Sequence, residues 1–212
     1  MIFKTIKSIL KSSIFISILL LCHIAIPAQK KSGIFLSGGK PILRDMKFGK
    51  DSWFKDESKL SSIISVSIGY RLRIHEQQSK GFFDFELAAG FTSINFDSRH
   101  LSVFPPYNTH ISASLFSIEG SYNYKIFKKL SAGIGIVPTI YLNEIEWYSL
   151  NESNYDTKFD SPLKAKIAYN FKVLELELYY KQGFTNSFHS RSFSSGKRNE
   201  WGLSLFFPFG KK

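Results

Sequence analysis

Cysteine is almost absent from this chain of 212 residues, and carboxylates are few beside the basic residues. The one cysteine is Cys22, and there are 17 Asp and Glu against 28 Lys and Arg. Cys22 lies in a predicted signal peptide, so the mature chain has no thiol, which excludes a disulfide framework and thiol chemistry. Mean hydropathy is close to zero although 16% of the residues are aromatic. That combination is unusual for a helical membrane protein and natural for a two-faced sheet.

The N-terminus has the three parts of a secretory signal peptide. Lysines precede an apolar core, Ile14 to Ile26, and small residues end at Ala28. We therefore expect residues 1–28 to be a cleaved signal peptide and residues 29–212 to be the mature domain. The alternative is an uncleaved anchor, but the uncharged stretch is just short of a spanning helix. Cleavage lowers the formal net charge from +11 to +8 by removing Lys4, Lys7 and Lys11.

Strict alternation of apolar and polar residues follows the signal. In the segment 64–74 every even position is apolar and every odd position is small or cationic, which indicates a strand with one apolar face. The segment 83–91 alternates in the same way, with carboxylates on its polar face. One hairpin register, turning about residues 77–79, satisfies both faces at once. It pairs Arg71 with Glu86 and Arg73 with Asp84.

Eight strands are predicted in total, joined by connections that are alternately long and short. The predicted strands are 32–37, 64–74, 83–91, 116–126, 130–142, 163–169, 174–180 and 201–209. Pro138 predicts a bulge or an interruption in the fifth strand. Outer membrane barrels have short periplasmic turns and longer extracellular loops. The pattern therefore places four long loops outside the cell: 40–61, 97–110, 147–162 and 186–199.

The direction of the apolar face separates a membrane barrel from a soluble lipocalin-like barrel or β-sandwich. A soluble barrel would turn about a dozen aromatic rings into a lumen that is too narrow for them. The polar face instead carries small residues and charges of nearly balanced sign, and buried charges require partners. The predicted fold class is therefore all-β, an eight-stranded antiparallel up-and-down transmembrane β-barrel with a plugged lumen. The residues expected to form lumen ion pairs are Arg71, Arg73, Asp84, Glu86, Lys166, Glu175 and Glu177.

The closing part of the chain carries a family resemblance. The segments 182–186 and 196–200, the aromatic strand to Phe209 and a signal ending in Ala28-Gln29 resemble the PorT-like outer membrane β-barrel proteins of the Bacteroidetes. The resemblance implies an eight-stranded barrel in the outer membrane, in a family whose members mostly have no assigned activity. The last strand also resembles the sorting signal that the barrel assembly machinery reads. The apolar residues of that signal are Trp201, Leu203, Leu205, Phe207 and Phe209.

The grouping closest to a catalytic site lies in the last long connection. His189 is near Ser187, Ser190, Ser192 and Glu200, and a nucleophile, a base and an orienting carboxylate are the parts of a hydrolase site. Small barrel lipid A deacylases use such residues, but their spacing requires Ser where this chain has Arg191. We therefore interpret these residues as a solvated loop. No catalytic residue, cofactor or metal site is expected.

These patterns predict a non-enzymatic, monomeric outer membrane protein that serves envelope structure, adhesion or a transport apparatus. The alternatives are a lipid A deacylase-like hydrolase that uses His189 and a nearby Ser, and a narrow pore. The expected partners are outer membrane lipids, lipopolysaccharide, the barrel assembly machinery and possible envelope proteins. Nucleic acid is not expected, because the chain is exported and its basic residues are spread over loops and turns.

Overall fold

The computed structural model describes residues 29–48, 59–75, 79–97, 108–148, 151–155, 158–185 and 193–209. The predicted signal peptide, residues 1–28, lies outside the described residues. The regular elements in the described ranges are all β-strands. No helix in these ranges is long and apolar enough to cross a bilayer.

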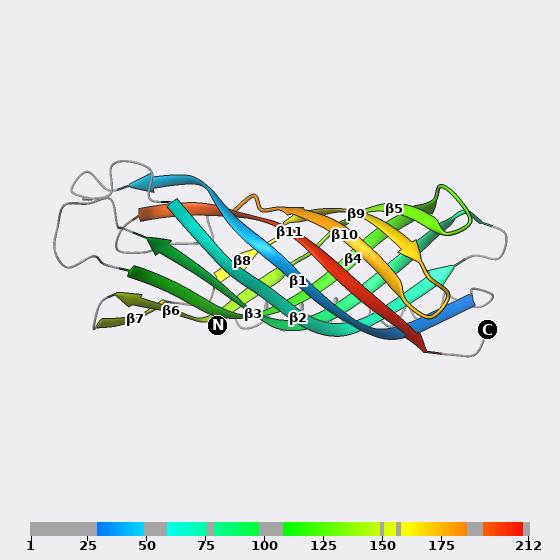
Figure 1. Cartoon of the computed structure of the whole chain (residues 1–212), viewed down its shortest axis with the longest axis horizontal. Coiled ribbons are helices and arrows are strands. Elements are labelled where there is room, and N and C mark those ends of the chain that lie inside the picture. The colour runs from blue at the N-terminus through cyan, green and yellow to red at the C-terminus, as the bar shows by residue number, and fades with distance from the viewer. Residues whose placement is uncertain are drawn as a thin grey trace, which may run out of the picture.

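The strands form one closed antiparallel barrel (Figure 1). β4 pairs with both β5 and β6, which together make one line of the wall, and β7, β8 and β9 make the next. The remaining pairs run in chain order, and β1 closes the wall against β11, from Ser32↔Phe209 onward. The wall thus has eight lines of strand, as predicted. The bounds are β1 Gln29–Phe48, β2 Lys59–His75, β3 Gly81–Asp97, β4 Asn108–Lys125, β5 Leu130–Ile136, β6 Thr139–Tyr148, β7 Asn151–Tyr155, β8 Lys158–Asp160, β9 Leu163–Asn170, β10 Glu175–Gln182 and β11 Phe193–Phe209.

The first hairpin has the register that the sequence predicts. In the β2–β3 ladder Arg71 is the partner of Glu86, and Arg73 is the partner of Asp84. The alternating patterns disfavour a slip of one residue, because such a slip would turn every apolar side chain of β2 into the lumen.

The predicted irregularity at Pro138 is also present. β5 ends at Ile136 and β6 starts at Thr139, because proline has no N–H to donate to the ladder. The residue before Pro138 bonds outside the regular ladder: Val137 N–H donates to the carbonyl of Pro162, at 2.9 Å. Pro162 lies in the gap between β8 and β9. Two adjacent lines of the wall are therefore interrupted at the same level.

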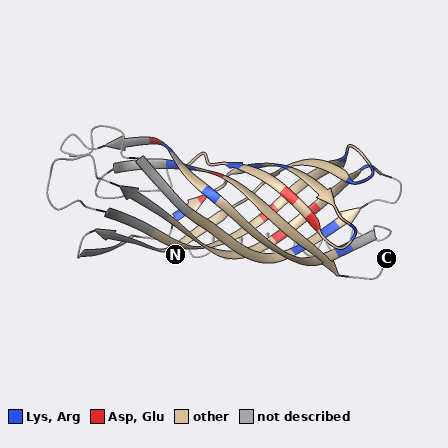
Figure 2. Cartoon of the chain, viewed as in Figure 1, with Lys and Arg blue, Asp and Glu red and all other residues tan. Residues whose placement is uncertain are grey.

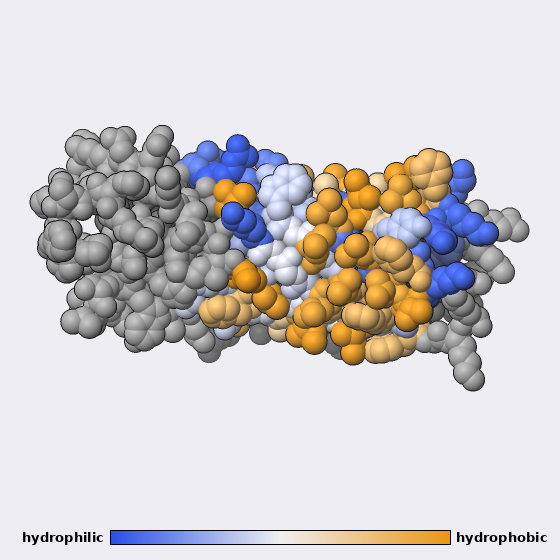
Figure 3. All heavy atoms as spheres, in the orientation of Figure 1, coloured by the Kyte–Doolittle hydropathy of each residue, from blue (hydrophilic) through white to orange (hydrophobic). Residues whose placement is uncertain are grey.

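Aliphatic and aromatic side chains cover the outside of the wall. Ile68 and Ile134 are each 59% exposed, and Trp201 is 52% exposed. Figure 3 shows hydrophobic residues gathered in a band on one face of the wall, with hydrophilic residues at the end of the barrel where β1 begins. Along a strand, the residues that alternate with the exposed ones are buried. The pattern of burial therefore repeats every two residues along β9 and much of β10.

The wall continues past this band at the end that carries the long connections. The predicted loops were too long, because strand occupies residues 40–48, 59–61, 108–110, 147–148, 151–155, 158–160 and 193–199. Pro41 lies in the part of β1 that belongs to the predicted loop 40–61. It is tolerated because β2 pairs with β1 only as far as Gly39↔Ser65, which leaves β1 an open edge beyond that point.

Candidate functional site

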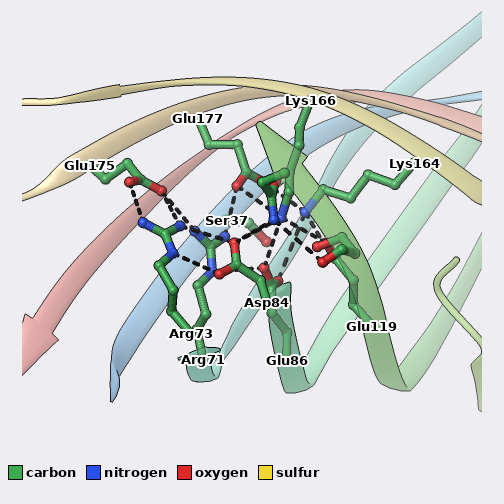
Figure 4. A network of polar contacts seen from close by, with 12 residues as sticks. Ser37, Arg71, Arg73, Asp84, Glu86, Glu119, Lys164, Lys166, Glu175 and Glu177 are labelled. Atoms are coloured by element: carbon green, nitrogen blue, oxygen red, sulfur yellow. Dashed lines mark hydrogen bonds and ion pairs between the residues drawn. The ribbon is translucent and has the colours of Figure 1, made fainter. Parts of the chain in front are cut away.

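A network of nine charged side chains from the described strands crosses the lumen (Figure 4). Each lies on the inward face of its strand, since its neighbours in sequence face outward. Arg71 and Asp84 have no exposed surface, and even the most accessible member, Arg73, has a side chain only 12% exposed. The network contains four cations and five carboxylates: Arg71, Arg73, Lys164, Lys166, Asp84, Glu86, Glu119, Glu175 and Glu177.

Arg71 connects opposite walls of the barrel. Its Nε lies 2.7 Å from Glu86 Oε1 on the adjacent strand β3. Its two Nη atoms donate to Glu175 at 3.2 Å and to Glu177 at 2.8 Å, both on β10. Two lines of the wall, β1 and β11, separate β2 from β10. The lumen is therefore narrow enough for one guanidinium to bind three carboxylates.

Arg73 lies one step nearer to the short turns and binds two carboxylates with paired hydrogen bonds. Nε and Nη2 donate to the two oxygens of Asp84, at 2.7 and 3.0 Å. Nη1 and Nη2 donate to the two oxygens of Glu175, at 2.7 and 2.8 Å. Paired bonds of this kind fix orientation as well as distance, so they hold both carboxylates in place.

Two lysines on β9 separate carboxylates that would otherwise repel each other. Glu86 and Glu119 are direct partners in the β3–β4 ladder, and like charges at such positions are unfavourable. Lys166 Nζ lies 3.0 Å from Glu119 and 3.5 Å from Glu86. Lys164 Nζ lies 2.8 Å from Glu119 and 2.7 Å from Glu177. Every carboxylate of the network thus has a cation, which buried charges require.

Aromatic rings also fill the lumen, which the sequence analysis did not predict. Phe206 and Phe35 flank the Arg71 guanidinium, with ring centroids at 4.8 and 5.5 Å from its Cζ. Arg73 lies 4.2 Å from the ring centroid of Phe82. The missing side chain of Gly69 makes room, because a Cβ there would lie 2.7 Å from the Phe35 ring. The rings buried inside are Phe35, Phe82, Tyr141, Tyr179 and Phe206.

A second polar cluster surrounds Glu200 on β11. Glu200 accepts hydrogen bonds from Tyr179 at 2.9 Å, from Arg198 at 2.8 Å and from Lys181 at 3.3 Å. Arg198 also donates to Ser65 Oγ at 3.1 Å. This cluster was not predicted, because residues 186–199, which include Arg198, were expected to form a loop. The alternation of Arg198 with Glu200 was the available signal.

Of the candidate hydrolase residues, the structure describes Glu200 alone. Glu200 is engaged inside the barrel, while His189, Ser187, Ser190 and Ser192 lie outside the described residues. Within the described ranges, no group of three or more His, Cys, Asp or Glu side chains is arranged to hold a metal ion.

All seven residues expected to form lumen ion pairs lie in the network. Lys166 contacts carboxylates of three strands, β3, β4 and β10. Lys164 and Glu119 belong to the network as well. Lys164 was predictable, because it alternates with Lys166 and therefore shares its face of β9. The five residues of the predicted sorting signal lie on β11 with Trp201, Leu203, Phe207 and Phe209 exposed on the outside and Leu205 half-buried.

The spaces left between the charged layers are small. A cavity of about 20 Å³ adjoins Arg198 and Glu200, and one of about 10 Å³ adjoins Glu119 and Lys164. Such volumes are on the scale of one water molecule each. The middle of the lumen is therefore filled by side chains.

Comparisons with known proteins agree with this architecture. No model of a known protein family matches the sequence, and no curated protein matches it significantly. The chain is similar in structure to Ail, the attachment invasion locus protein of Yersinia pestis, solved in complex with the heparin analogue sucrose octasulfate. The TM-score is 0.50 and the identity 10%, over 85% of this chain and 99% of that chain. At that identity the likeness concerns the fold alone.

Two further solved structures have lower scores. The N-terminal β-barrel domain of OprF from Pseudomonas aeruginosa has a TM-score of 0.48 at 11% identity, over 85% of this chain and 100% of that chain. Neisserial surface protein A has a TM-score of 0.47 at 8% identity, over 86% of this chain and 99% of that chain. Fold and lumen together define the class of this protein as a closed eight-stranded β-barrel with an apolar exterior and an ion-paired interior.

Proposed function

We propose that this protein is a non-enzymatic integral barrel of the bacterial outer membrane, closed to ions by its lumen network. One observation carries the proposal: the wall is apolar outside (Figure 3) and charged inside (Figure 4). A barrel in water requires the opposite arrangement. Closure of the wall through β1 and β11 also removes free sheet edges, which hydrocarbon does not tolerate.

The connections give the orientation. The short turns β2–β3, β4–β5 and β9–β10 lie at the same end as the start of β1 and the end of β11 (Figure 1). In outer membrane barrels the end with short turns faces the periplasm. The other end, where the wall rises above the apolar band, then faces the outside of the cell.

The height of the wall supports a surface role. β1 has 20 residues, whereas about 9–11 residues are enough for a tilted strand to span a bilayer. Antiparallel pairing of β1 with β11 continues, through two register shifts, to Phe48↔Phe193, so this extra length of β1 is strand and not a loop. We infer that this extension of the wall presents the outer connections for adhesion or for contact with a transport apparatus.

The finer assignments are part of this proposal. The protein would be a monomeric member of the PorT-like barrels of the Bacteroidetes, exported by residues 1–28. Its apolar band would contact outer membrane lipids and lipopolysaccharide, and its last strand would be read by the barrel assembly machinery. The outward row on β11, from Trp201 to Phe209, supports the last point.

Heat-modifiable gel migration of the protein from isolated outer membranes tests barrel and location together. We expect the unheated protein to run as a compact species and the boiled protein to run near its mass of 24.3 kDa less the signal peptide. Recovery in the soluble fraction would refute the membrane assignment.

Planar bilayer recording tests the closed lumen. The purified barrel is expected to give no steady current under conditions in which an open porin conducts. A stable ion current through the wild-type protein would replace the plugged barrel with a pore. Lipid A mass spectra with and without expression test the hydrolase alternative, and loss of an acyl chain that depends on His189 would establish it.

A further inference from the structure

The lumen opens into a cavity of about 330 Å³ at the end with the short turns. β1 and β2 form one side, the β4–β5 turn forms the other, and Phe82 contributes a ring to the lining. This volume is at the lower end of the range typical of small-molecule sites. It exceeds the two inner cavities by more than tenfold.

The charges of this cavity are unbalanced, unlike those of the network beneath it. The described residues that line it include one carboxylate, Glu175, which is already bound by Arg71 and Arg73. In the part of the chain that the structure describes, no ion pair joins a carboxylate to any of the lining lysines. The lining cations are Lys31, Arg73, Lys125, Lys128 and Lys129. Figure 2 shows Lys and Arg gathered at this end of the barrel.

Among the described residues, Lys125 pairs with an imidazole and with no carboxylate. Its Nζ lies 2.9 Å from His75 Nε2, and His75 Nδ1 lies 3.3 Å from the carbonyl oxygen of Gly81. An imidazole that donates from Nδ1 to this carbonyl accepts at Nε2 from the ammonium. One of the three N–H bonds of Lys125 is used in this way, and the other two are free to donate to an anion.

Repulsion among the lining cations falls on the lysines, because Arg73 is already held by Asp84 and Glu175. Lys125 faces Arg73 across the Phe82 ring, whose centroid lies 4.2 Å from the guanidinium and 6.0 Å from the ammonium. The ring provides some cation–π attraction to Lys125, but less than a carboxylate would. A bound anion with several acceptor oxygens would neutralise Lys125 and the neighbouring lysines.

We propose that this mouth of the barrel is a binding site for a phosphate group. A tetrahedral oxyanion offers acceptors in several directions, which suits ammonium groups that approach from both sides of the cavity. The phosphate has two possible sources with the same chemistry. One is a soluble periplasmic phosphate compound. The other is the headgroup of an adjacent phospholipid, since Phe127 on the β4–β5 turn is 70% exposed beside Lys128.

The test uses the full mature barrel in maltoside micelles, which contain no phosphate. Inorganic phosphate and pyrophosphate are titrated by calorimetry at constant chloride, and a short-chain phosphatidylglycerol is tested for adducts by native mass spectrometry. The test variant is Lys125→Gln/Lys129→Gln. The control is Lys40→Gln/Lys172→Gln, which removes the same charge from exposed residues outside the cavity. Heat-modifiable migration must be unchanged in both variants.

Loss of the two lysines is expected to weaken phosphate binding at least about tenfold, and the control is expected to bind like the wild type. Binding of soluble phosphate identifies a periplasmic ligand. Adducts of the phospholipid alone, sensitive to the same two substitutions, identify the headgroup. The proposal is wrong if neither compound binds, or if the test and control variants lose binding equally.

Discussion

Arg71 on β2 and Glu177 on β10 meet across the middle of the barrel, with 2.8 Å between Nη2 and Oε2. Both side chains are almost without exposed surface. The pair joins walls that are not adjacent in the sheet, so it braces the barrel in a direction that ladder hydrogen bonds do not.

Removal of Arg71 is expected to be costly. Arg71→Met leaves Glu86, Glu175 and Glu177 with fewer cations in a buried site, and breaking one partner of a buried ion pair typically costs about 3–5 kcal/mol. Urea unfolding of the barrel in lipid vesicles, followed by tryptophan fluorescence, measures the free energy of unfolding. Arg44→Met is the matched control, because Arg44 is exposed on β1, and its effect is expected to stay within about 0.5 kcal/mol. Equal losses in the two variants would contradict the bracing role.

The close contact between Gly69 and Phe35 makes a second prediction. An alanine at position 69 would press its Cβ against the Phe35 ring and the Leu87 carbonyl, and overpacking of this kind costs about 1–3 kcal/mol. Gly120→Ala is the control, since no atom lies within 4 Å of a Cβ at that position. Adding Phe35→Leu to Gly69→Ala should restore part of the stability. If it restores none, steric conflict with the ring is not the cause.

A charged residue substituted into the apolar band tests whether lipid or water surrounds the wall. Ile68→Arg is expected to lower the free energy of unfolding in vesicles by about 2–4 kcal/mol, as for cations at the middle of a bilayer. Val173→Arg, on the exposed β9–β10 turn, is expected to have little effect. An unchanged stability for Ile68→Arg would show that this face does not contact lipid.

Asp45 lies on β1 beyond the apolar band, and the pKa of its carboxyl can be measured there. The hydrogen bond from Lys197, at 2.8 Å, and the charge of that ammonium lower the pKa of the Asp45 carboxyl. An NMR titration of the barrel should find the pKa below its ordinary value and should find it raised again in Lys197→Gln. Because the folded pKa is lowered, any stabilisation is present above the ordinary pKa and is lost as pH falls through the folded value. The pair is exposed, so the change in stability should be small.

The sequence was informative where two constraints acted on the same residues. Apolar alternation and charge sign together determined the β2–β3 register, and the contact of Arg71 with Glu86 follows from it. Partners across the lumen, such as Glu177, depend on how the barrel closes and on the stagger of its strands. No local pattern contains that information.

The errors at the outer rim have a different origin. Alternation of apolar and polar residues reports a difference between the two faces of a strand, and it stops where β1 and β11 leave the apolar band. The first strand was expected to end at residue 37, although pairing continues from Gly38↔Leu203 to Pro41↔Glu200. The Glu200 cluster was not predicted because Arg198 was assigned to the loop 186–199, although β11 already includes Arg198.

The seam between β1 and β11 has a consequence for biogenesis. Its two strands, residues 29–48 and 193–209, lie far apart in the sequence, so the cylinder cannot be sealed until β11 has been synthesised. An intermediate without β11 would leave β1 and β10 each with one unpaired border. Sealing of the circle therefore waits for β11, however early the other strands pair.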